Sequence, residues 1–238
     1  MKPFLSYTKT GNKPLLMFHG YGQDASVFKG IDGYSFDLFF HGKSVWTKDE
    51  APLEKSEWKE MISEFLIKNN IDTFSVLGFS MGGKFALATL EAFPDRVKEI
   101  ILIAPDGIKT SFWYSLATYP IALRNVFKSM INNHPRFLRI AIASKKLGLI
   151  DKGVLRFVET QMDSEEKRKR VYYSWVVFRH LKFDINKIKR LIDDNHIRLR
   201  LYIGRYDKVI KAKDMKRLTS KIEILDAGHN DILRKIKI

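Results

Sequence analysis

One short motif constrains this chain more than any other feature of its sequence. Gly78-Phe79-Ser80-Met81-Gly82 stands between an apolar run at 73–77 and an amphipathic segment. Glycine two residues before and two residues after the serine permits a sharp strand-to-helix turn, because no side chain keeps the two elements apart. Such a turn strains the serine backbone, lifts its hydroxyl clear of the sheet and places it at a helix N-terminus. A glycine-rich turn with a serine cap is the alternative, but the strand–turn–helix context favours Ser80 as a nucleophile.

The surrounding sequence predicts an α/β fold. Short apolar runs alternate with amphipathic segments, which is typical of a parallel sheet flanked by helices. We expect strands at 15–18, 36–40, 73–77, 97–104, 197–203 and 222–225. Apolar residues at helical spacing predict helices at 58–66, 85–90, 184–194 and 212–218.

The alternation stops after Pro105. Residues 107–183 show helical spacing and no convincing strand. A structureless loop of this length is improbable, so we predict a folded helical cap inserted into a core made of 1–106 and 184–238. Its aromatic residues either line an acyl pocket or, more commonly, form the core of the cap: Phe112, Trp113, Tyr114, Tyr172, Tyr173 and Trp175.

A serine nucleophile needs a base, and the base needs an acid that orients it. His229 follows the last predicted strand and Asp207 follows the strand before it. Because ligands bind outside the carboxyl ends of parallel strands, we expect both side chains near Ser80. Asp106 also follows a strand and is the competing acid. The other five histidines are interpreted as packing, loop or surface residues: His19, His41, His134, His180 and His196.

The net charge of +15 is regional. Residues 1–106 carry a balance of −2, whereas 107–196 carry +10 and 197–238 carry +7. The densest cluster, Lys167-Arg168-Lys169-Arg170, is either a solvated helix face, which is the commoner case, or a footprint for phosphate, a membrane surface or an anionic substrate. No helix-turn-helix, RNP or zinc-finger pattern accompanies it, so we do not expect a nucleic-acid partner.

Several absences narrow the class of protein. The chain has no cysteine, which excludes a disulfide framework and a thiolate zinc site and fits a reducing compartment. No apolar run is long enough for a spanning helix, and Met1–Pro14 lacks the apolar core of a secretory signal. We therefore expect a cytoplasmic protein with no integral membrane segment, no metal and no cofactor. Its oligomeric state is left open.

Taken together, the motifs resemble the α/β-hydrolase superfamily, in its serine-nucleophile branch, almost from end to end. The matching segments are the oxyanion turn His19-Gly20-Tyr21-Gly22, the loop Asp37–Ser44, the nucleophile elbow Gly78–Gly82, the connection Phe93–Pro105, the acid turn Gly204–Asp207 and the histidine turn Gly228-His229. The resemblance implies a mostly parallel, eight-stranded sheet, with the helical block inserted after the sixth strand as a lid. Phe39 and Phe40 stand where relatives commonly have proline and glycine, so we expect that loop to run differently.

The resemblance also implies a function. We expect a metal-free serine hydrolase of the carboxylesterase type that cleaves a small to medium ester through an acyl-enzyme. Ser80 would attack, His229 would act as base and Asp207 would orient it. The backbone N–H groups of Met81 and Tyr21 would form the oxyanion hole. Thioester cleavage, carbon–carbon hydrolysis of a diketone, and ligand binding without turnover remain open on the same fold.

Overall fold

A computed structural model describes residues 2–109, 112–133 and 162–236, together with Pro135, Arg139 and Ala143. The chain divides into two compact units. The core unit comprises Met1–Lys48, Leu53–Thr110 and His180–Ile238, and the helical unit comprises Asp49–Pro52 and Ser111–Arg179.

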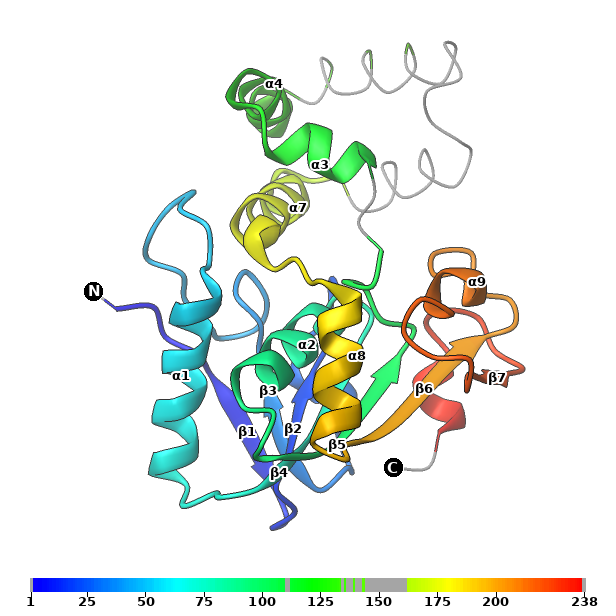
Figure 1. The fold of residues 1–238 in the computed structure, drawn as a ribbon. Coiled ribbons are helices and arrows are strands. Elements are labelled where there is room, and N and C mark those ends of the chain that lie inside the picture. The colour runs from blue at the N-terminus through cyan, green and yellow to red at the C-terminus, as the bar shows by residue number, and fades with distance from the viewer. Residues whose placement is uncertain are drawn as a thin grey trace. The chain divides into compact units, whose positions relative to one another are not determined.

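A seven-stranded sheet forms the centre of the core unit (Figure 1). Its strands are β1 (Tyr7–Thr10), β2 (Leu15–Phe18), β3 (Gly33–Phe36), β4 (Phe74–Phe79), β5 (Val97–Ile103), β6 (Arg198–Gly204) and β7 (Glu223–Leu225). They lie in the order β1-β3-β2-β4-β5-β6-β7. Strand β1 runs antiparallel to its neighbour, and the other strand pairs of this sheet are parallel. The predicted α/β class and mostly parallel sheet are confirmed.

The number of strands was predicted wrongly. Within the described residues the sheet has seven strands rather than eight, and the helical block follows the fifth strand, β5. Among the described residues before β1, Phe4 forms an isolated bridge with Val45. Strand β1 itself escaped prediction because its four residues lie at the sheet edge, half-buried or exposed, without an apolar run.

The predicted strand at 36–40 was also wrong. The extended segment is β3, which ends at Phe36, and the chain then turns. The Asp37 carboxylate closes this turn by accepting hydrogen bonds from the N–H groups of Ala25 and Lys43, each at 2.8 Å. Phe40 has a φ of +68°, a left-handed conformation that is incompatible with a strand. The apolar run is therefore a buried loop.

Three longer helices cover one face of the sheet: α1 (Lys55–Lys68), α2 (Gly82–Ala92) and α8 (Ile185–Asp194) (Figure 1). The other described helical segments of the core unit are short: η1 (Ala25–Phe28), α9 (Ala212–Met215) and η3 (Ile232–Lys235). Trp58 of α1 is fully buried, its ring lies against Phe18 and Phe85, and its Nε1–H donates to Thr89 Oγ1 at 3.0 Å. This contact joins α1, α2 and β2.

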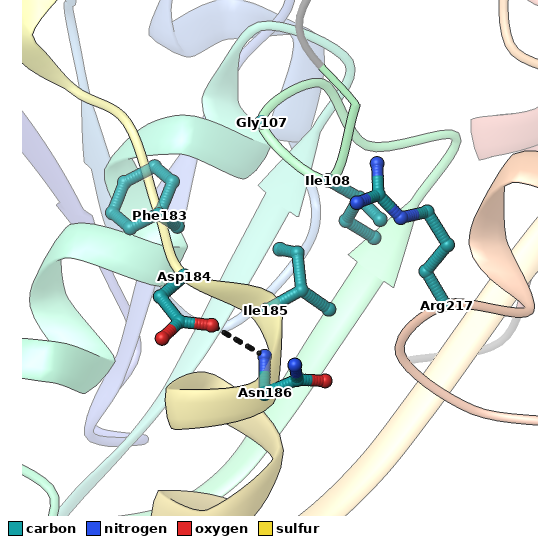
Figure 2. A pocket seen from close by; sticks show the side chains of 7 residues that line it. All are labelled: Gly107, Ile108, Phe183, Asp184, Ile185, Asn186 and Arg217. Carbon is teal, nitrogen blue, oxygen red and sulfur yellow. Dashed lines mark hydrogen bonds between the residues drawn. The ribbon is translucent and has the colours of Figure 1, made fainter.

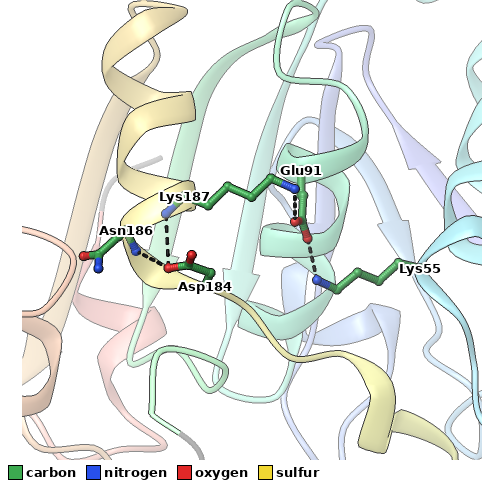
Figure 3. A network of polar contacts seen from close by, with 5 residues as sticks. All are labelled: Lys55, Glu91, Asp184, Asn186 and Lys187. Carbon is green, nitrogen blue, oxygen red and sulfur yellow. Dashed lines mark hydrogen bonds and ion pairs between the residues drawn. The ribbon is translucent and has the colours of Figure 1, made fainter.

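A shared carboxylate ties the same three helices together (Figure 3). Glu91 of α2 accepts from Lys55 Nζ of α1 at 2.6 Å and from Lys187 Nζ of α8 at 2.8 Å. Burial pushes the pKa of Glu91 upward, but the hydrogen bonds from the two lysines outweigh it, so the pKa lies below its usual value. Asp184 caps α8 by accepting from the N–H groups of Asn186 and Lys187.

The helical unit contains α3 (Phe112–Thr118), α4 (Ile121–Asn132) and α7 (Glu165–Val177), and η2 (Phe178–His180) spans its boundary with the core unit. Ile131, Tyr172 and Val176 form its core, with Phe127 and Tyr173 packed against them. The two tyrosines therefore take the commoner of the two predicted roles, as packing residues. The side chains of Phe112 and Trp113 lie outside the described residues.

Candidate active site

Ser80 occupies a tight turn between β4 and α2. Its φ is +50°, a left-handed conformation that costs a non-glycine residue about 1–2 kcal/mol. A Cβ on Gly78 would lie 2.6 Å from the carbonyl oxygen of Gly82, and a Cβ on Gly82 would lie 2.0 Å from that of Phe18. Both glycines are therefore required by the close approach of backbone to backbone.

The structure brings Ser80, His229 and Asp207 together at the carboxyl edge of the sheet. His229 Nε2 lies 2.9 Å from Ser80 Oγ, and His229 Nδ1 lies 2.6 Å from Asp207 Oδ2. The side chain of Asp207 is 0% exposed and that of His229 is 16% exposed. The ring of Phe79 lies against the imidazole, with centroids 5.4 Å apart. These contacts fix the imidazole between the hydroxyl and the carboxylate.

The second oxygen of Asp207 is also engaged. Oδ1 accepts from the N–H of Val209 at 2.7 Å and from the N–H of Ile210 at 2.8 Å. Two backbone donors thus orient the carboxylate and direct Oδ2 at His229. Because an ionised carboxylate only accepts hydrogen bonds, Nδ1 must carry the proton, which leaves Nε2 free to accept the serine proton.

Asp106, the competing acid, has other partners. Its Oδ2 lies 3.3 Å from Nζ of Lys84, a lysine on α2 that is only 7% exposed, and its Oδ1 accepts from the N–H of Gly107 at 2.7 Å. The backbone N–H of Asp106 donates to the carbonyl of Ser80 at 2.8 Å. Asp106 therefore supports the backbone of the turn, while Asp207 contacts the imidazole. Lys84 had no part in the sequence prediction.

The two expected oxyanion donors lie in different turns. Met81 directly follows Ser80 and precedes the eleven-residue helix α2. Tyr21 lies in the turn after β2, where the N–H of Gly20 donates to Gln23 Oε1 at 3.0 Å. Sequence reasoning missed Gln23, since no motif marks it.

His19 holds this turn in place. It is fully buried, its Nδ1 donates to the carbonyl of Gly20 at 2.7 Å, and its Nε2 accepts from the N–H of Leu38 at 3.0 Å. Burial lowers its pKa, which keeps the ring neutral, as these two bonds require. Its predicted role as a packing and loop hydrogen-bonding residue is confirmed.

Phe40, in the loop that follows β3, has a left-handed backbone conformation that glycine adopts readily. The different course of this loop, expected because Phe39 and Phe40 depart from the family pattern, stays a prediction. Ser44 Oγ donates to the carbonyl of Asp37 at 2.5 Å, and Gly42 leaves no space for a Cβ beside the Asp37 carboxylate. His41 is buried, and its Nδ1 lies 3.0 Å from the carbonyl of Phe39. The loop motif is thus built around Asp37 and packs beside the His19 turn.

Two of the remaining histidines occupy other surroundings. His180 contacts Glu54 at 2.7 Å, and His196 takes a φ of +52° in the turn before β6. His134 lies outside the described residues.

Nearby carboxylates compensate three of the four cations in the basic cluster of α7. Three cations pair with carboxylates four residues earlier: Lys167 with Asp163, Lys169 with Glu165 and Arg170 with Glu166, at 2.9, 2.6 and 2.8 Å. Arg168 is buried and donates to the carbonyls of Ile131 and Met162. These contacts match the interpretation as an ordinary helix face better than a footprint for an anionic partner.

A separate pocket of about 360 Å³ opens beside the start of α8 (Figure 2). Its lining comes from the chain after β5, from the beginning of α8 and from Arg217: Gly107, Ile108, Phe183, Asp184, Ile185, Asn186 and Arg217. Ser80, Asp207 and His229 are not among these lining residues.

The described ranges contain neither a metal-binding cluster nor a membrane-spanning helix. No group of three or more His, Cys, Asp or Glu residues there could hold a metal ion. No helix in that part of the chain is both long and apolar enough to cross a membrane.

Comparison with known proteins connects the chain to one family. A sequence model described as alpha/beta hydrolase fold matches residues 13–148. The chain is 26% identical over 166 residues to the pimeloyl-[acyl-carrier protein] methyl ester esterase of Nitrosomonas europaea, covering 62% of this chain and 63% of the relative. It is 29% identical over 114 residues to the rat 1-acylglycerol-3-phosphate O-acyltransferase ABHD5, covering 43% of this chain and 32% of the relative.

A solved structure shares the fold over nearly the whole chain. The thermophilic esterase from Thermogutta terrifontis superposes with a TM-score of 0.67 at 16% identity, covering 97% of this chain and 88% of the other. The matches to the curated relatives are shorter, and span between about a third and two thirds of the relatives' own lengths.

Proposed function

The chain belongs to the α/β-hydrolase family, and from that premise we propose that it is a serine hydrolase of the carboxylesterase type. Its substrate would be a small to medium ester, cleaved through an acyl-enzyme. The observation that carries the proposal is the pair of hydrogen bonds that links Asp207, His229 and Ser80. The esterase relative and the structurally similar esterase both support assignment as a hydrolase.

In the proposed mechanism, Ser80 Oγ attacks the ester carbonyl while His229 Nε2 takes the hydroxyl proton. The buried Asp207 stabilises the imidazolium that forms and keeps the ring in the required tautomer. The resulting tetrahedral intermediate expels the alcohol, to which His229 returns the proton. Water then attacks the acyl-enzyme with His229 as base, and the acid is released with Ser80 restored.

The negative charge on the substrate oxygen needs donors that are in place before the reaction. We assign this role to the backbone N–H groups of Met81 and Tyr21. Met81 is the residue that caps the N-terminus of α2, and the helix dipole there favours an anion. Loss of one such donor typically costs ~10²–10³ in kcat.

The helical unit is proposed to be the cap of this enzyme. Its residues, Ser111–Arg179 with Asp49–Pro52, have their own core at Tyr172 and are joined to the core unit after β5 and before α8. We propose that this cap shapes the acyl-binding space, that catalysis needs no metal or cofactor, and that the protein acts in the cytoplasm without nucleic acid.

Labelling by a fluorophosphonate probe tests the nucleophile. Wild-type protein should react, whereas Ser80→Ala and His229→Ala should not, because the probe requires an activated serine. Ser129→Ala, which removes an exposed hydroxyl of α4, is the matched control and should label like wild type. Equal labelling of wild type and Ser80→Ala would refute the assignment.

A substrate panel then tests the reaction class. Nitrophenyl esters of increasing acyl length should be hydrolysed faster than the corresponding thioesters and faster than a diketone. Preference for a thioester or for the diketone would replace the ester proposal with one of the two alternatives. A folded protein that neither labels nor turns over any member of the panel would favour ligand binding without catalysis.

A further inference from the structure

Two large apolar side chains are exposed on the loop that contains Asp207. Tyr206 is 61% exposed and Val209 is 66% exposed, although both lie within three residues of a fully buried carboxylate. Contiguous exposed apolar surface marks interaction sites, whereas single exposed apolar residues are common, so these two side chains gain meaning only from what surrounds them.

The same segment carries a concentration of positive charge. Residues 205–217 contain six Lys or Arg and two Asp, a balance of +4. Two of the charges are compensated, since Arg205 lies 3.3 Å from Asp226, and Asp214 pairs with Lys109 at 3.0 Å. The other cations are exposed and form no ion pair within the described residues: Lys208, Lys211, Lys213, Lys216 and Arg217. We call residues 205–217 the acid loop.

This distribution differs from that of the Lys167–Arg170 cluster. On α7 each exposed cation has a carboxylate one turn away, so the cluster presents little net field. In the acid loop the five cations other than Arg205 lack such partners among the described carboxylates. Charged and apolar side chains also lie close together there, as in Tyr206-Asp207-Lys208-Val209. Apolar side chains at the headgroup level flanked by lysines are the pattern of interfacial membrane binding.

The loop is also held in its exposed position. The N–H groups of Arg205 and Tyr206 donate to the carbonyls of Leu225 and Ala227, at 2.7 and 3.1 Å. Beyond them, Asp207 Oδ1 accepts from the N–H of Val209. Because the backbone is fixed before binding, little conformational entropy would be lost on docking.

We infer that the acid loop docks on an anionic lipid surface, with Tyr206 and Val209 entering the headgroup region and the exposed lysines contacting acidic headgroups. Asp207 is part of both the acid loop and the candidate active site. One of its carboxylate oxygens accepts from the loop backbone, and the other contacts His229. Docking would therefore place the carboxyl edge of the sheet, and with it Ser80, beside the lipid surface. This inference concerns binding and goes beyond the proposed ester hydrolysis.

Vesicle cosedimentation of the Ser80→Ala protein tests the inference without interference from turnover. The protein should bind vesicles of phosphatidylcholine with phosphatidylserine, and bind vesicles of phosphatidylcholine alone at least tenfold more weakly. Binding should weaken steeply as salt rises, because the Debye length falls from about 10 Å at 0.1 M to about 3 Å at 1 M.

Two triple variants, each of which removes three positive charges, test whether vesicle binding depends on where the charge lies or only on the net charge. Lys208→Gln/Lys211→Gln/Lys213→Gln should weaken binding about 100-fold, since each cation near an anionic surface contributes roughly a fivefold factor. Lys167→Gln/Lys169→Gln/Arg170→Gln removes the same charge from α7 and should weaken binding no more than about threefold, because those cations are already paired. A second loop variant, Tyr206→Ser/Val209→Ser, should weaken binding while leaving net charge unchanged.

Three results would overturn the inference. Equal binding to neutral and anionic vesicles would exclude the charge contribution, and equal losses in the two triple variants would exclude the acid loop. Failure to bind anionic vesicles would refute docking on a lipid surface, and binding to soluble polyglutamate in that case would assign the charges to an acidic protein partner instead. Thermal melting of each variant identifies any loss that comes from unfolding.

Discussion

Replacing Asp207 by asparagine changes one atom of the site but reverses a hydrogen bond. In the wild type, Oδ1 accepts from two backbone N–H groups and Oδ2 faces His229 Nδ1. An asparagine must place its carbonyl oxygen toward the two N–H donors, because its amino group would meet them donor to donor. The amino group then faces His229 and donates to Nδ1. The imidazole is forced into the tautomer with a proton on Nε2, which cannot accept the serine proton.

The expected fall in kcat follows from the loss of His229 as a base. A wrong tautomer in a serine–histidine–aspartate site lowers kcat by ~10⁴, equivalent to about 5 kcal/mol of transition-state stabilisation. The KM should change little, since the side chain of Asp207 is fully buried and therefore out of reach of a substrate. Steady-state hydrolysis of a nitrophenyl ester, with protein melting as a control for folding, measures both quantities.

Asp106→Asn is the matched control for this prediction. Asp106 pairs with Lys84 and keeps its backbone N–H on Ser80, so its substitution should cost stability and retain kcat within about tenfold. A folded Asp207→Asn protein with kcat within tenfold of wild type would refute the tautomer reasoning. A collapse of kcat in Asp106→Asn alone would identify Asp106 as the acid.

Three further predictions concern folding and the turn at Ser80. Trp58→Ala should lower the free energy of unfolding by about 3–5 kcal/mol in urea titrations, because the ring is fully buried. Gly82→Ala should abolish fluorophosphonate labelling, since its Cβ would lie 2.0 Å from the carbonyl oxygen of Phe18; labelling at the wild-type rate would contradict the geometry. The pKa of Glu91 is lowered in the folded protein, so its contribution is present above the ordinary value of 4.5 and lost as pH falls through the folded pKa. Glu91→Gln should therefore reduce the fall of the urea midpoint between pH 6 and pH 3, and an unchanged profile would show that the carboxylate contributes nothing.

The fold could be predicted where periodicity and burial agree. Leu15–Phe18 is apolar, fully buried and central in the sheet, so its limits were predicted to the residue. The segment after Phe36 failed because burial alone does not distinguish a strand from a buried loop: Leu38 and Phe39 are both 0% exposed, yet the backbone turns. Strand β1 failed for the opposite reason, because an edge strand needs no apolar run.

The site could be predicted as far as topology determines it. Parallel strands end at one edge, so residues that follow β4, β6 and β7 meet there whatever the intervening sequence. From the sequence we predicted Asp207 rather than Asp106 as the acid, although both residues follow strands. The reason why Asp106 is occupied elsewhere could not be predicted. Lys84 engages Asp106, and that contact requires the three-dimensional structure.

Ion pairs between residues distant in the sequence likewise could not be predicted from the sequence. A spacing of four residues between Glu165 and Lys169 indicates an ion pair along one helix, and this ion pair is present in the structure. Cations that have no carboxylate partner in the described part of the chain, such as Lys208 and Lys211, can be identified only when the neighbouring carboxylates have been placed. The sequence therefore pointed to the denser cluster, although the acid loop holds more uncompensated charge.

The central claim, an acyl-enzyme on Ser80, is tested most directly by partitioning between two acceptors. Three esters of one acid with different alcohols are hydrolysed in the presence of hydroxylamine, and the ratio of hydroxamate to free acid is measured for each. A common acyl-enzyme predicts the same ratio for all three, because the alcohol has left before the acceptor attacks. A ratio that changes with the alcohol would contradict the account and indicate direct attack of water on the bound ester.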